Sequence, residues 1–314
     1  MIRSSIFTVT GGAGFIGKHF IKRMLENGHY VTNIDVMNYA ADRKAALEFL
    51  DYDKYRHVHQ DISNLHHLQE CDYLVNFAAE SHVDNSIASS REFCFSNFIG
   101  THRLLELTRA KAPDDRPHFI QISTDEVYGD IKEGTHSEDD ILKPSNPYSA
   151  TKAAADMLVH GWARTYGIRY SIIRMTNNYG KHQYPEKLIP KSAGRMLRGK
   201  PALLQGNGTY YRNWLHAEDS VDAILTVIEK GEANRIYNVC GNTELQNIEV
   251  VRKIAAIIGI EENRAYKFVA DRVGQDVRYS LDSSALHALG WMPRRNFDEE
   301  LRKIIEAVDF HRFI

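Results

Sequence analysis

A glycine-rich turn near the start of the chain constrains its fold more than any other feature. Residues 6–10 read Ile-Phe-Thr-Val-Thr, a β-prone run, and residues 11–17 follow directly as Gly-Gly-Ala-Gly-Phe-Ile-Gly. Apolar residues then recur at helical spacing as far as Gly28. Glycines let a backbone approach a pyrophosphate closely, and a helix N-terminus offers N–H donors and a favourable dipole. This strand, turn and helix predict a dinucleotide-binding unit, although the spacing is Gly-x-x-Gly-x-x-Gly and not Gly-x-Gly-x-x-Gly.

An acidic residue at the end of the next β-prone run indicates which dinucleotide binds. Residues 30–35 read Tyr-Val-Thr-Asn-Ile-Asp, so Asp35 closes this run at about the distance from the glycines where a carboxylate hydrogen-bonds the adenosine ribose. That carboxylate would repel a 2′-phosphate, and no arginine follows Asp35 directly. The sequence therefore favours NAD over NADP as the cofactor.

Strand and helix signals alternate through the first half of the chain. Residues 56–60 and 72–77 are β-prone, and residues 96–112 predict a long helix. Such alternation predicts an α/β fold with a Rossmann-like, doubly wound parallel sheet. After residue 175 the alternation weakens, which predicts a smaller C-terminal α/β substrate domain. Within it, residues 247–258 predict an amphipathic helix and residues 298–310 a final helix. The predicted NAD-binding domain comprises 1–175, with 215–240 returning to it, and the predicted substrate-binding domain comprises 176–214 and 241–314.

Two carboxylates and a hydroxyl lie where another predicted strand ends. Residues 118–122 form a β-prone run, and residues 123–129 follow as Ser-Thr-Asp-Glu-Val-Tyr-Gly. In open α/β sheets ligands bind at this end of the strands. A solvated acidic turn is the alternative interpretation of the same residues.

A tyrosine and a lysine share one face of the next predicted helix. Asn146 and Pro147 suit its N-cap and first turn, and Tyr148 and Lys152 lie four residues apart. Because a nearby ammonium favours the phenolate, we expect Lys152 to lower the pKa of Tyr148 enough for it to act as a base near neutrality. Alone, the pair is equally consistent with two surface side chains. Together with the glycine turn and the acids at the strand end, it indicates acid-base chemistry.

The overall composition argues against several other classes of protein. With 314 residues, 43% hydrophobic and 25% charged, the chain is long enough for one large or two ordinary globular domains. A formal net charge of -2 gives no reason to expect a nucleic-acid partner, and no apolar run approaches the length of a membrane span. Cys71, Cys94 and Cys240 lie far apart and the histidines are scattered, so no metal is expected. We expect reduced thiols, no signal peptide and a cytoplasmic location.

Several segments together resemble the extended short-chain dehydrogenase/reductase family. They lie at residues 10–17, 76–84, 123–129, 148–152, 177–180, 185–190 and 289–291. The first and fourth of them mark only the superfamily. The Thr-Asp-Glu triplet at 124–126 is more specific, because sugar 4-epimerases of the same family usually lack the Asp-Glu pair. It makes the chain similar to the nucleotide-sugar 4,6-dehydratases, most of all to the dTDP-glucose 4,6-dehydratases.

This resemblance implies a reaction and a role for each of five residues. Tyr148 takes the proton of the sugar C4 hydroxyl while hydride passes from C4 to NAD, Lys152 holds the cofactor ribose, and Thr124 binds near the C4 oxygen. Glu126 then removes the C5 proton, and Asp125, in its protonated form, donates to the departing C6 hydroxyl. Hydride returns to C6, so water is lost without net redox change. Repulsion and burial can separate the pKa values of two adjacent carboxyls as this division requires.

The resemblance also implies binding residues and partners. The implied cofactor residues are Gly11, Gly14, Phe15, Ile16, Gly17, Asp35, Asn38, Asp61, Ile62, Ala78, Ala79, Ser96, Tyr148 and Lys152. The implied substrate residues are Ser81, His82, Asn177, Glu186, Lys187, Leu188, Arg212, Asn247, Arg272 and Arg278. A nucleotide sugar is the implied partner, and a homodimer is implied in which the helices at 96–112 and 148–166 pack against their copies.

Three departures from the family pattern leave the substrate open. Asn85 stands where arginine is common, Asn213 stands where aspartate is usual, and residues 272–279 read Arg-Val-Gly-Gln-Asp-Val-Arg-Tyr where Arg-Pro-Gly-His-Asp-Arg-Arg-Tyr is usual. The substrate could be dTDP-glucose, UDP-glucose, UDP-N-acetylglucosamine or another NDP-hexose. Two other functions also stay open. One is an NDP-sugar 4-epimerase or decarboxylase on the same scaffold, and the other is a non-catalytic regulator that binds NAD or a sugar nucleotide.

Overall fold

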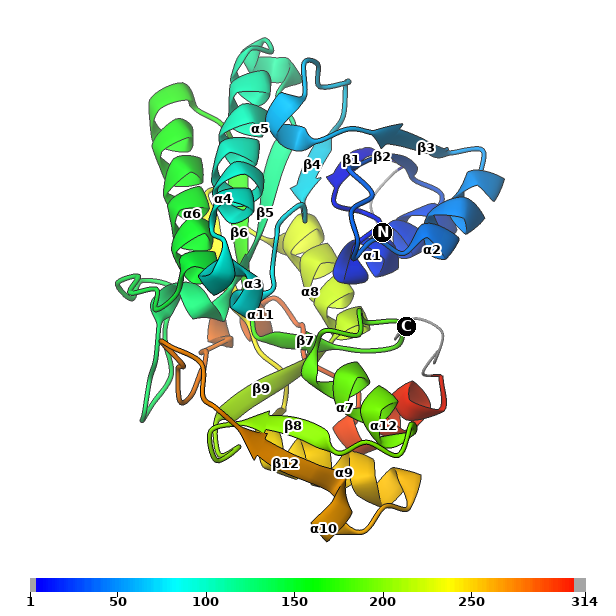
Figure 1. Ribbon diagram of the computed structural model, residues 1–314. Coiled ribbons are helices and arrows are strands. Elements are labelled where there is room, and N and C mark those ends of the chain that lie inside the picture. The colour runs from blue at the N-terminus through cyan, green and yellow to red at the C-terminus, as the bar shows by residue number, and fades with distance from the viewer. Residues whose placement is uncertain (1–3, 308–314) are drawn as a thin grey trace.

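The computed structural model describes residues 4–307, and seven strands of this part of the chain form one parallel sheet (Figure 1). They are β1 (Ile6–Thr10), β2 (Tyr30–Asp35), β3 (Tyr55–His59), β4 (Tyr73–Asn76), β5 (His118–Thr124), β6 (Tyr170–Met175) and β10 (Arg235–Val239). Their order is β10-β6-β5-β4-β1-β2-β3. The chain winds outward in both directions from β1, which creates a crevice at the carboxyl ends of β1 and β4. The predicted fold class is confirmed.

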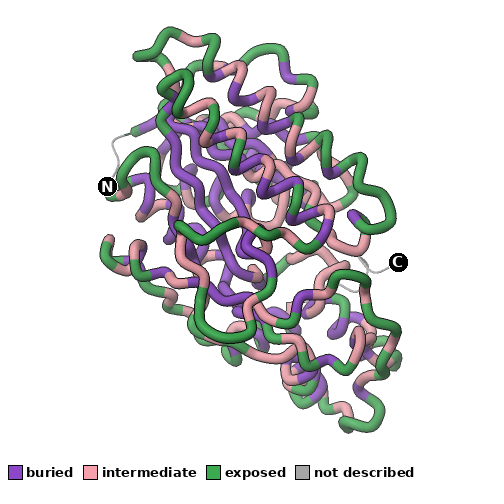
Figure 2. The backbone as a smooth tube through the Cα atoms, turned by 90° about the vertical axis from the view of Figure 1, so that its left-hand side faces the viewer, coloured by how far each residue is buried: buried purple, intermediate pink, exposed green. Residues whose placement is uncertain are grey.

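Helices cover both faces of this sheet (Figure 1). On one face α1 (Phe15–Glu26) contacts α8 (Ala217–Lys230), and their apolar side chains join a core that includes Phe20 and Val227. On the other face α5 (Gly100–Arg109) contacts α6 (Pro147–Tyr166), over a core that includes Leu104 and Val159. Because both faces are covered, every residue of β5 and β6 is buried. Figure 2 shows this buried backbone running through the middle of the molecule.

The remaining strands form a second lobe, drawn below the large sheet in Figure 1. In it β7 (Asn177–Tyr179), β9 (Tyr211–His216) and β11 (Thr243–Gln246) make one sheet, and β8 (Ala202–Gln205) pairs with β12 (Tyr266–Val269). The helices of this lobe are α7 (Leu188–Met196), α9 (Asn247–Ile258), α10 (Glu262–Ala265) and α12 (Phe297–Glu306). They surround a separate hydrophobic cluster that contains Trp214 and Leu301. The bounds of α9 are those that the sequence predicted.

The chain passes between the two lobes more than once. After β9 it re-enters the large sheet, where β10 pairs in parallel with β6 from Arg235 opposite Ser171 to Val239 opposite Met175. Helix α11 (Ser284–Ala288) also packs on α8 and β10, although it lies in the range predicted for the other domain. The domain boundaries themselves stay a prediction.

The helix predicted at 96–112 has a different form in the structure. The chain is already helical in α4 (Arg91–Phe93), continues as a π-helical segment at Cys94–Ile99 and ends with α5. Within the π segment the buried Asn97 accepts a hydrogen bond from the Glu80 N–H (2.8 Å) and donates one to the Glu80 carbonyl (3.0 Å). The predicted long helix is therefore found, but it begins at Arg91, ends at Arg109 and is π-helical from Cys94 to Ile99, where Asn97 contacts a distant segment of the chain.

The last predicted helix, at 298–310, corresponds to α12, which begins at Phe297 and ends at Glu306. Its start is fixed by Asn296, whose side chain accepts hydrogen bonds from the N–H groups of Asp298 and Glu299. Residues 308–310 of that prediction lie outside the described residues.

Leu104 tests the packing of α5 on the sheet. Its side chain is fully buried among Leu105 and Phe119. Leu104→Ala leaves a cavity, so we expect the free energy of unfolding to fall by about 3 kcal/mol in urea denaturation. Leu47→Ala, at an exposed position of α2 (Arg43–Glu48), should change it by less than about 1 kcal/mol. Equal losses in the two variants would contradict the burial of Leu104.

Candidate active site

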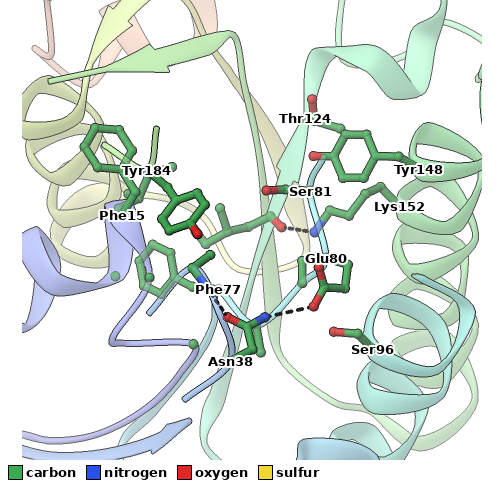
Figure 3. Close-up of a pocket in the computed structure, with 18 of the residues that line it drawn as sticks. Phe15, Asn38, Phe77, Glu80, Ser81, Ser96, Thr124, Tyr148, Lys152 and Tyr184 are labelled. Atoms are coloured by element: carbon green, nitrogen blue, oxygen red, sulfur yellow. Dashed lines mark hydrogen bonds between the residues drawn. The ribbon is translucent and has the colours of Figure 1, made fainter. Parts of the chain in front are cut away.

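A cavity of about 550 Å³ lies along the carboxyl ends of the parallel strands. Its lining begins at the glycine turn after β1, includes the segments that follow β2 to β6, and reaches the second lobe at the segment after β7. Figure 3 shows Asn38 and Ser96 toward one end of it and Thr124 and Tyr148 toward the other. The cavity thus occupies the place where doubly wound sheets bind their ligands.

The glycine turn has the close backbone approach that its residues predict. Gly11 has a φ of 67°, and a Cβ there would lie 2.6 Å from the backbone nitrogen of Ala78. A Cβ on Gly17 would lie 2.5 Å from the Gly11 carbonyl oxygen. Both positions therefore require glycine. Gly14 precedes α1 and no side chain caps this helix, so its first N–H groups are suited to an anionic ligand.

Asp35 lies against this turn at the end of β2. One carboxylate oxygen accepts a hydrogen bond from the Ala13 N–H (2.9 Å), and the other accepts one from the Met37 N–H (2.7 Å). Since each carboxylate oxygen can accept more than one bond, Asp35 can also bind a ribose hydroxyl. Nearby, the Asn38 amide donates to the Glu80 carboxylate (2.8 Å; Figure 3). The Asp35 carboxylate thus offers an acceptor to a ribose hydroxyl and would repel a 2′-phosphate on that ribose.

The acid pair occupies a 3₁₀ turn (η5, Asp125–Tyr128) that follows β5 directly. The Thr124 hydroxyl accepts a hydrogen bond from the Glu126 N–H (3.3 Å) and donates one to Oδ1 of Asp125 (3.0 Å). Asn146 donates to Oε2 of Glu126 (3.2 Å). Oδ2 of Asp125 is buried and has no hydrogen-bond partner among residues 4–307. One oxygen of this acid is therefore left for a ligand.

Helix α6 presents Tyr148 and Lys152 because its start is fixed by a capping box. The Asn146 side chain accepts from the Ser149 N–H (2.9 Å), and the Ser149 hydroxyl accepts from the Asn146 N–H (3.2 Å). Pro147 occupies the first helical turn, as predicted. Four residues make about one helical turn, so Tyr148 and Lys152 project from the same face.

Tyr148 and Lys152 both reach β5. The Tyr148 phenol hydrogen-bonds Thr124, and the Lys152 ammonium donates to the Ile122 carbonyl at 2.5 Å. Burial, and then the charge of Glu126, raise the pKa of Tyr148 above its usual range. Burial lowers the pKa of Lys152 to about 8. The predicted lowering of the phenol pKa is therefore not found, because burial outweighs the ammonium and a backbone carbonyl engages it.

The surroundings of the turn give its two carboxyl groups different pKa values. Burial, and then the charge of Glu126, raise the pKa of Asp125 to about 8. Burial also raises the pKa of Glu126, but the hydrogen bond from the α6 N-cap and the charges of Arg212, Lys187 and Arg272 oppose that rise. Asp125 is thus protonated at neutral pH, and Glu126 is the acid of the pair that ionises first.

The geometry of this site can be compared with known proteins over almost the whole chain. Residues 8–304 match the family described as GDP-mannose 4,6 dehydratase. The chain belongs to this family. The match spans both lobes, from β1 to α12, so it covers the cavity and all of its surroundings.

Individual relatives cover the same length. The chain is 41% identical to the low-salt glycan biosynthesis protein Agl12 of Haloferax volcanii, over 95% of this chain and 96% of that protein. It is 40% identical to a dTDP-glucose 4,6-dehydratase of Haemophilus influenzae over the same shares. The crystal structure of DesIV, a dTDP-glucose 4,6-dehydratase from Streptomyces venezuelae with NAD and TYD bound, superposes with a TM-score of 0.91 at 37% identity over 96% of each chain. The predicted family resemblance is confirmed.

The cavity gathers most of the residues that the sequence singled out. All predicted catalytic and cofactor residues line it: Gly11, Gly14, Phe15, Ile16, Gly17, Asp35, Asn38, Asp61, Ile62, Ala78, Ala79, Ser96, Thr124, Asp125, Glu126, Tyr148 and Lys152. Of the predicted substrate residues, Ser81, Asn177, Glu186 and Lys187 also line it. Their roles in binding stay predictions.

Six predicted substrate residues lie outside the lining of this cavity: His82, Leu188, Arg212, Asn247, Arg272 and Arg278. Arg278 pairs with the Glu244 carboxylate at 2.7 Å, and Arg272 pairs with Asp84 at 3.1 Å. Arg212 donates to backbone carbonyls, among them that of Asp276 at 3.1 Å. Arg212 and Arg272 nevertheless act on the cavity through their charge, because both favour ionisation of Glu126.

Several lining residues were missed in the sequence. Gln60 is the last residue of a predicted strand and Glu80 lies in the family segment at 76–84, so the position of each was a usable signal. Tyr39 and Tyr184 have no such pattern. Their rings meet edge to face with centroids 5.3 Å apart, and the Tyr39 hydroxyl donates to Glu186 (3.2 Å). This contact joins the loop after β2 to the second lobe.

The described residues were also searched for features of other protein classes. No group of three or more His, Cys, Asp or Glu side chains within residues 4–307 could hold a metal ion. Cys71, Cys94 and Cys240 are free thiols. None of the helices in that part of the chain is long and apolar enough to cross a membrane.

Asp125 gives a prediction about stability. Its folded-state pKa of about 8 lies above the unfolded value of about 4. The stability of the wild-type protein should therefore fall as pH rises from 4 to 8, since unfolding releases the proton that folding retains. Asp125→Asn abolishes this dependence, and we expect it to raise the free energy of unfolding at pH 7 by about 2 kcal/mol in urea denaturation.

The gain from Asp125→Asn should vanish near pH 4, where the carboxyl is protonated in both states. Asp72→Asn serves as the control, because the Asp72 carboxylate accepts a hydrogen bond from the Ile6 N–H at the far end of the sheet. A gain that is the same at pH 4 and pH 7 would contradict the raised pKa of Asp125.

Proposed function

We propose that this chain converts dTDP-glucose, or another NDP-hexose such as UDP-glucose or UDP-N-acetylglucosamine, to the 4-keto-6-deoxy sugar. The steps are oxidation at C4, loss of water across C5 and C6, return of hydride to C6, and protonation of C5. The predicted reaction class, an NAD-dependent nucleotide-sugar 4,6-dehydratase, and the predicted cofactor are confirmed by the family and its members. The choice of dTDP rests on the relatives that carry it in their names. The observation that carries the proposed mechanism is the protonated Asp125 beside Glu126, in one cavity with Tyr148 and Lys152.

The first-lobe end of the cavity fits NAD. When bound, this cofactor accepts hydride from C4 and later returns it to C6. The glycine turn and the N-terminus of α1 would hold its pyrophosphate, and Asp35 would hold its adenosine ribose. Lys152 would hold the second ribose, since its ammonium lines the cavity next to β5.

Tyr148 is the proposed base for the C4 hydroxyl. Its phenol hydrogen-bonds Thr124, whose hydroxyl donates onward to Asp125, so the proton positions at this end of the cavity are ordered. Because burial raises its pKa, the phenol needs positive charge nearby to give up its proton. Lys152, one helical turn away, supplies that charge.

The acid pair is proposed to carry the elimination. Asp125 is protonated at neutral pH and has a free Oδ2, so it can donate a proton to the C6 hydroxyl, which leaves as water. Glu126 ionises first and can accept the C5 proton that the 4-ketone acidifies. The opposite assignment would require the more acidic member of the pair to hold the proton.

The alternative functions have less support. A 4-epimerase or decarboxylase on this scaffold needs the Tyr148 and Lys152 set but has no need of two adjacent carboxyls with separated pKa values. A non-catalytic regulator needs neither set. This chain has both the Tyr148 and Lys152 pair and the acid pair, and a member of each is buried: Lys152 and Asp125 are each less than 5% exposed. Burying such groups costs free energy, which a binding module would not need to expend.

We further propose a homodimer in the cytoplasm. Phe95 and Ile99 of the π segment and Met157 of α6 are exposed apolar side chains on adjacent helices. A second copy packed on these helices would cover them, in agreement with the predicted helix pair. The free thiols suit a reducing compartment.

Glu126→Gln tests the proposed base. The amide retains the size of the side chain and its contact with Asn146, but it does not accept the C5 proton. We expect oxidation at C4 to continue and water loss to slow by roughly 100-fold or more, so that reduced cofactor accumulates in a single turnover and is seen by its absorbance. Unchanged formation of the 4-keto-6-deoxy product would sink the role given to Glu126.

A panel of NDP-hexoses tests the substrate. We expect dTDP-glucose to give the highest kcat/KM, with solvent deuterium at C5 of the product and no accumulated reduced cofactor. UDP-glucose, UDP-N-acetylglucosamine and GDP-mannose complete the panel. A product inverted at C4 would point to the epimerase alternative, and binding without turnover would point to the regulator.

A further inference from the structure

A buried ion pair lies beneath the active site and outside the lining of the cavity. Nε of Arg174 on β6 lies 3.0 Å from Oδ2 of Asp156 on α6, and the two side chains are 1% and 0% exposed. Neither residue lines the cavity. Apolar residues of similar volume often stabilise a fold as well as a buried ion pair does. The contacts of this pair therefore indicate what else it does.

The Asp156 carboxylate of the pair hydrogen-bonds β5 next to the acid turn. Oδ2 of Asp156 accepts a hydrogen bond from the Ser123 hydroxyl at 3.0 Å. Ser123 follows Ile122, whose carbonyl binds the Lys152 ammonium. Lys152 and Asp156 lie one turn apart on α6, so the helix holds two consecutive residues of β5, just before Thr124 begins the acid turn.

The Arg174 guanidinium of the pair contacts the last residue of the acid turn. Nη1 of Arg174 donates to the Tyr128 hydroxyl at 2.7 Å, and its guanidinium lies 4.8 Å from the centre of the Tyr128 ring. Tyr128 is the last residue of η5, and its hydroxyl donates onward to Asn238 at 2.9 Å. The ion pair therefore connects α6, which carries Tyr148 and Lys152, to both ends of the turn that carries the acids.

The same carboxylate acts on Lys152 through its charge. Burial lowers the pKa of Lys152, and the negative charge of Asp156 opposes that effect. The other titratable or charged groups packed around this part of α6 are Tyr148 and His160 on the helix itself, Asp125, Glu126 and Tyr128 on η5, and Arg174 on β6. Asp156 is the acid among them that sits on the helix one turn from the ammonium.

We propose that Asp156, held by Arg174, is a positioning residue of the reaction: its carboxylate is the counter-charge one helical turn from the Lys152 ammonium, and it holds the acid turn in register with the Tyr148 and Lys152 face of α6. The inference rests on the proposed function, since that function gives Lys152 and the acid turn their roles. Asp156 acts through these groups and does not itself touch the substrate.

Asp156→Asn tests the proposal, because the amide keeps the shape of the side chain and removes its charge. Without that charge the Lys152 ammonium should lose its proton at lower pH. We expect the alkaline limb of the kcat profile to move down by about one pH unit. At pH 8 kcat should fall by roughly 5-fold, while KM for the NDP-hexose should change by less than about 2-fold. Lys152→Met tests whether this alkaline limb belongs to Lys152, since the variant should lack the limb.

Two further variants separate this role from a structural one. Asp156→Asn leaves Arg174 buried without its counter-ion, so Asp156→Asn with Arg174→Gln removes both charges. The alkaline limb should stay displaced in the double variant. Asp222→Asn is the matched control, since Asp222 is an ion-paired acid on α8, 2.7 Å from Arg23, and outside the lining of the site. The alkaline limb of the kcat profile of Asp222→Asn should stay at the wild-type pH.

The cofactor gives a readout that does not depend on turnover. NAD affinity, followed by fluorescence quenching from pH 6 to pH 10, should fall through the Lys152 transition, and Asp156→Asn should move that fall to lower pH. An alkaline transition at the wild-type position in both the single and the double variant would overturn the proposal. If no NDP-hexose is converted, the proposed function fails, whereas this titration still decides the role of Asp156.

Discussion

The placement of two adjacent carboxyl groups at the end of β5, with Asp125 buried and Glu126 half-buried, is the constraint on which the rest of the site depends. Ionising both Asp125 and Glu126 within one buried turn is unfavourable, because each charge loses its hydration and repels the other. One of them therefore keeps its proton. The Thr124 hydroxyl orders Asp125, and the positive charges around the turn favour ionisation of Glu126. A proton donor and a proton acceptor follow from this inequality, although the two side chains are chemically alike.

The second lobe contributes to this difference in protonation between Asp125 and Glu126, although both acids lie in the first lobe. Arg212 lies on β9, Lys187 precedes α7 and Arg272 follows β12, so the charges that favour ionisation of Glu126 all come from that lobe. Arg272 also pairs with Asp84, and Tyr39 contacts Glu186 across the cavity. The lobe that is expected to hold the nucleotide sugar thus also sets the protonation of the acid turn. A change in how the lobes meet would alter the chemistry as well as the binding.

The predictable part of the site is the part encoded by local patterns. The glycine turn, Asp35 at a strand end and the N-cap Asn146 before Tyr148 each depend on residues within a few positions of one another, and each is found as expected. The π segment around Asn97 and the raised pKa of Tyr148 were not anticipated. Both depend on neighbours that are distant in the sequence, so no local periodicity contains them.

The arginines show the same division. Their side chains are long, and several partners compete for each guanidinium. Sequence position suggested phosphate contacts for Arg278, but the fold places its guanidinium against Glu244. The sequence predicted no role for Arg174, yet its guanidinium links Asp156 to Tyr128 beneath the acid turn.

The sequence by itself determined the class of fold, the cofactor and the set of candidate reacting groups, because strand ends, glycine spacing and helical spacing are properties of neighbouring residues. Only the tertiary structure decided the protonation of those groups. A pKa depends on burial and on every charge within a few ångströms, and those surroundings come from β5, β6, α6 and the second lobe together. Asp125 and Glu126 are adjacent in the chain and nearly equivalent as acids. The packing around them makes one a donor and the other an acceptor.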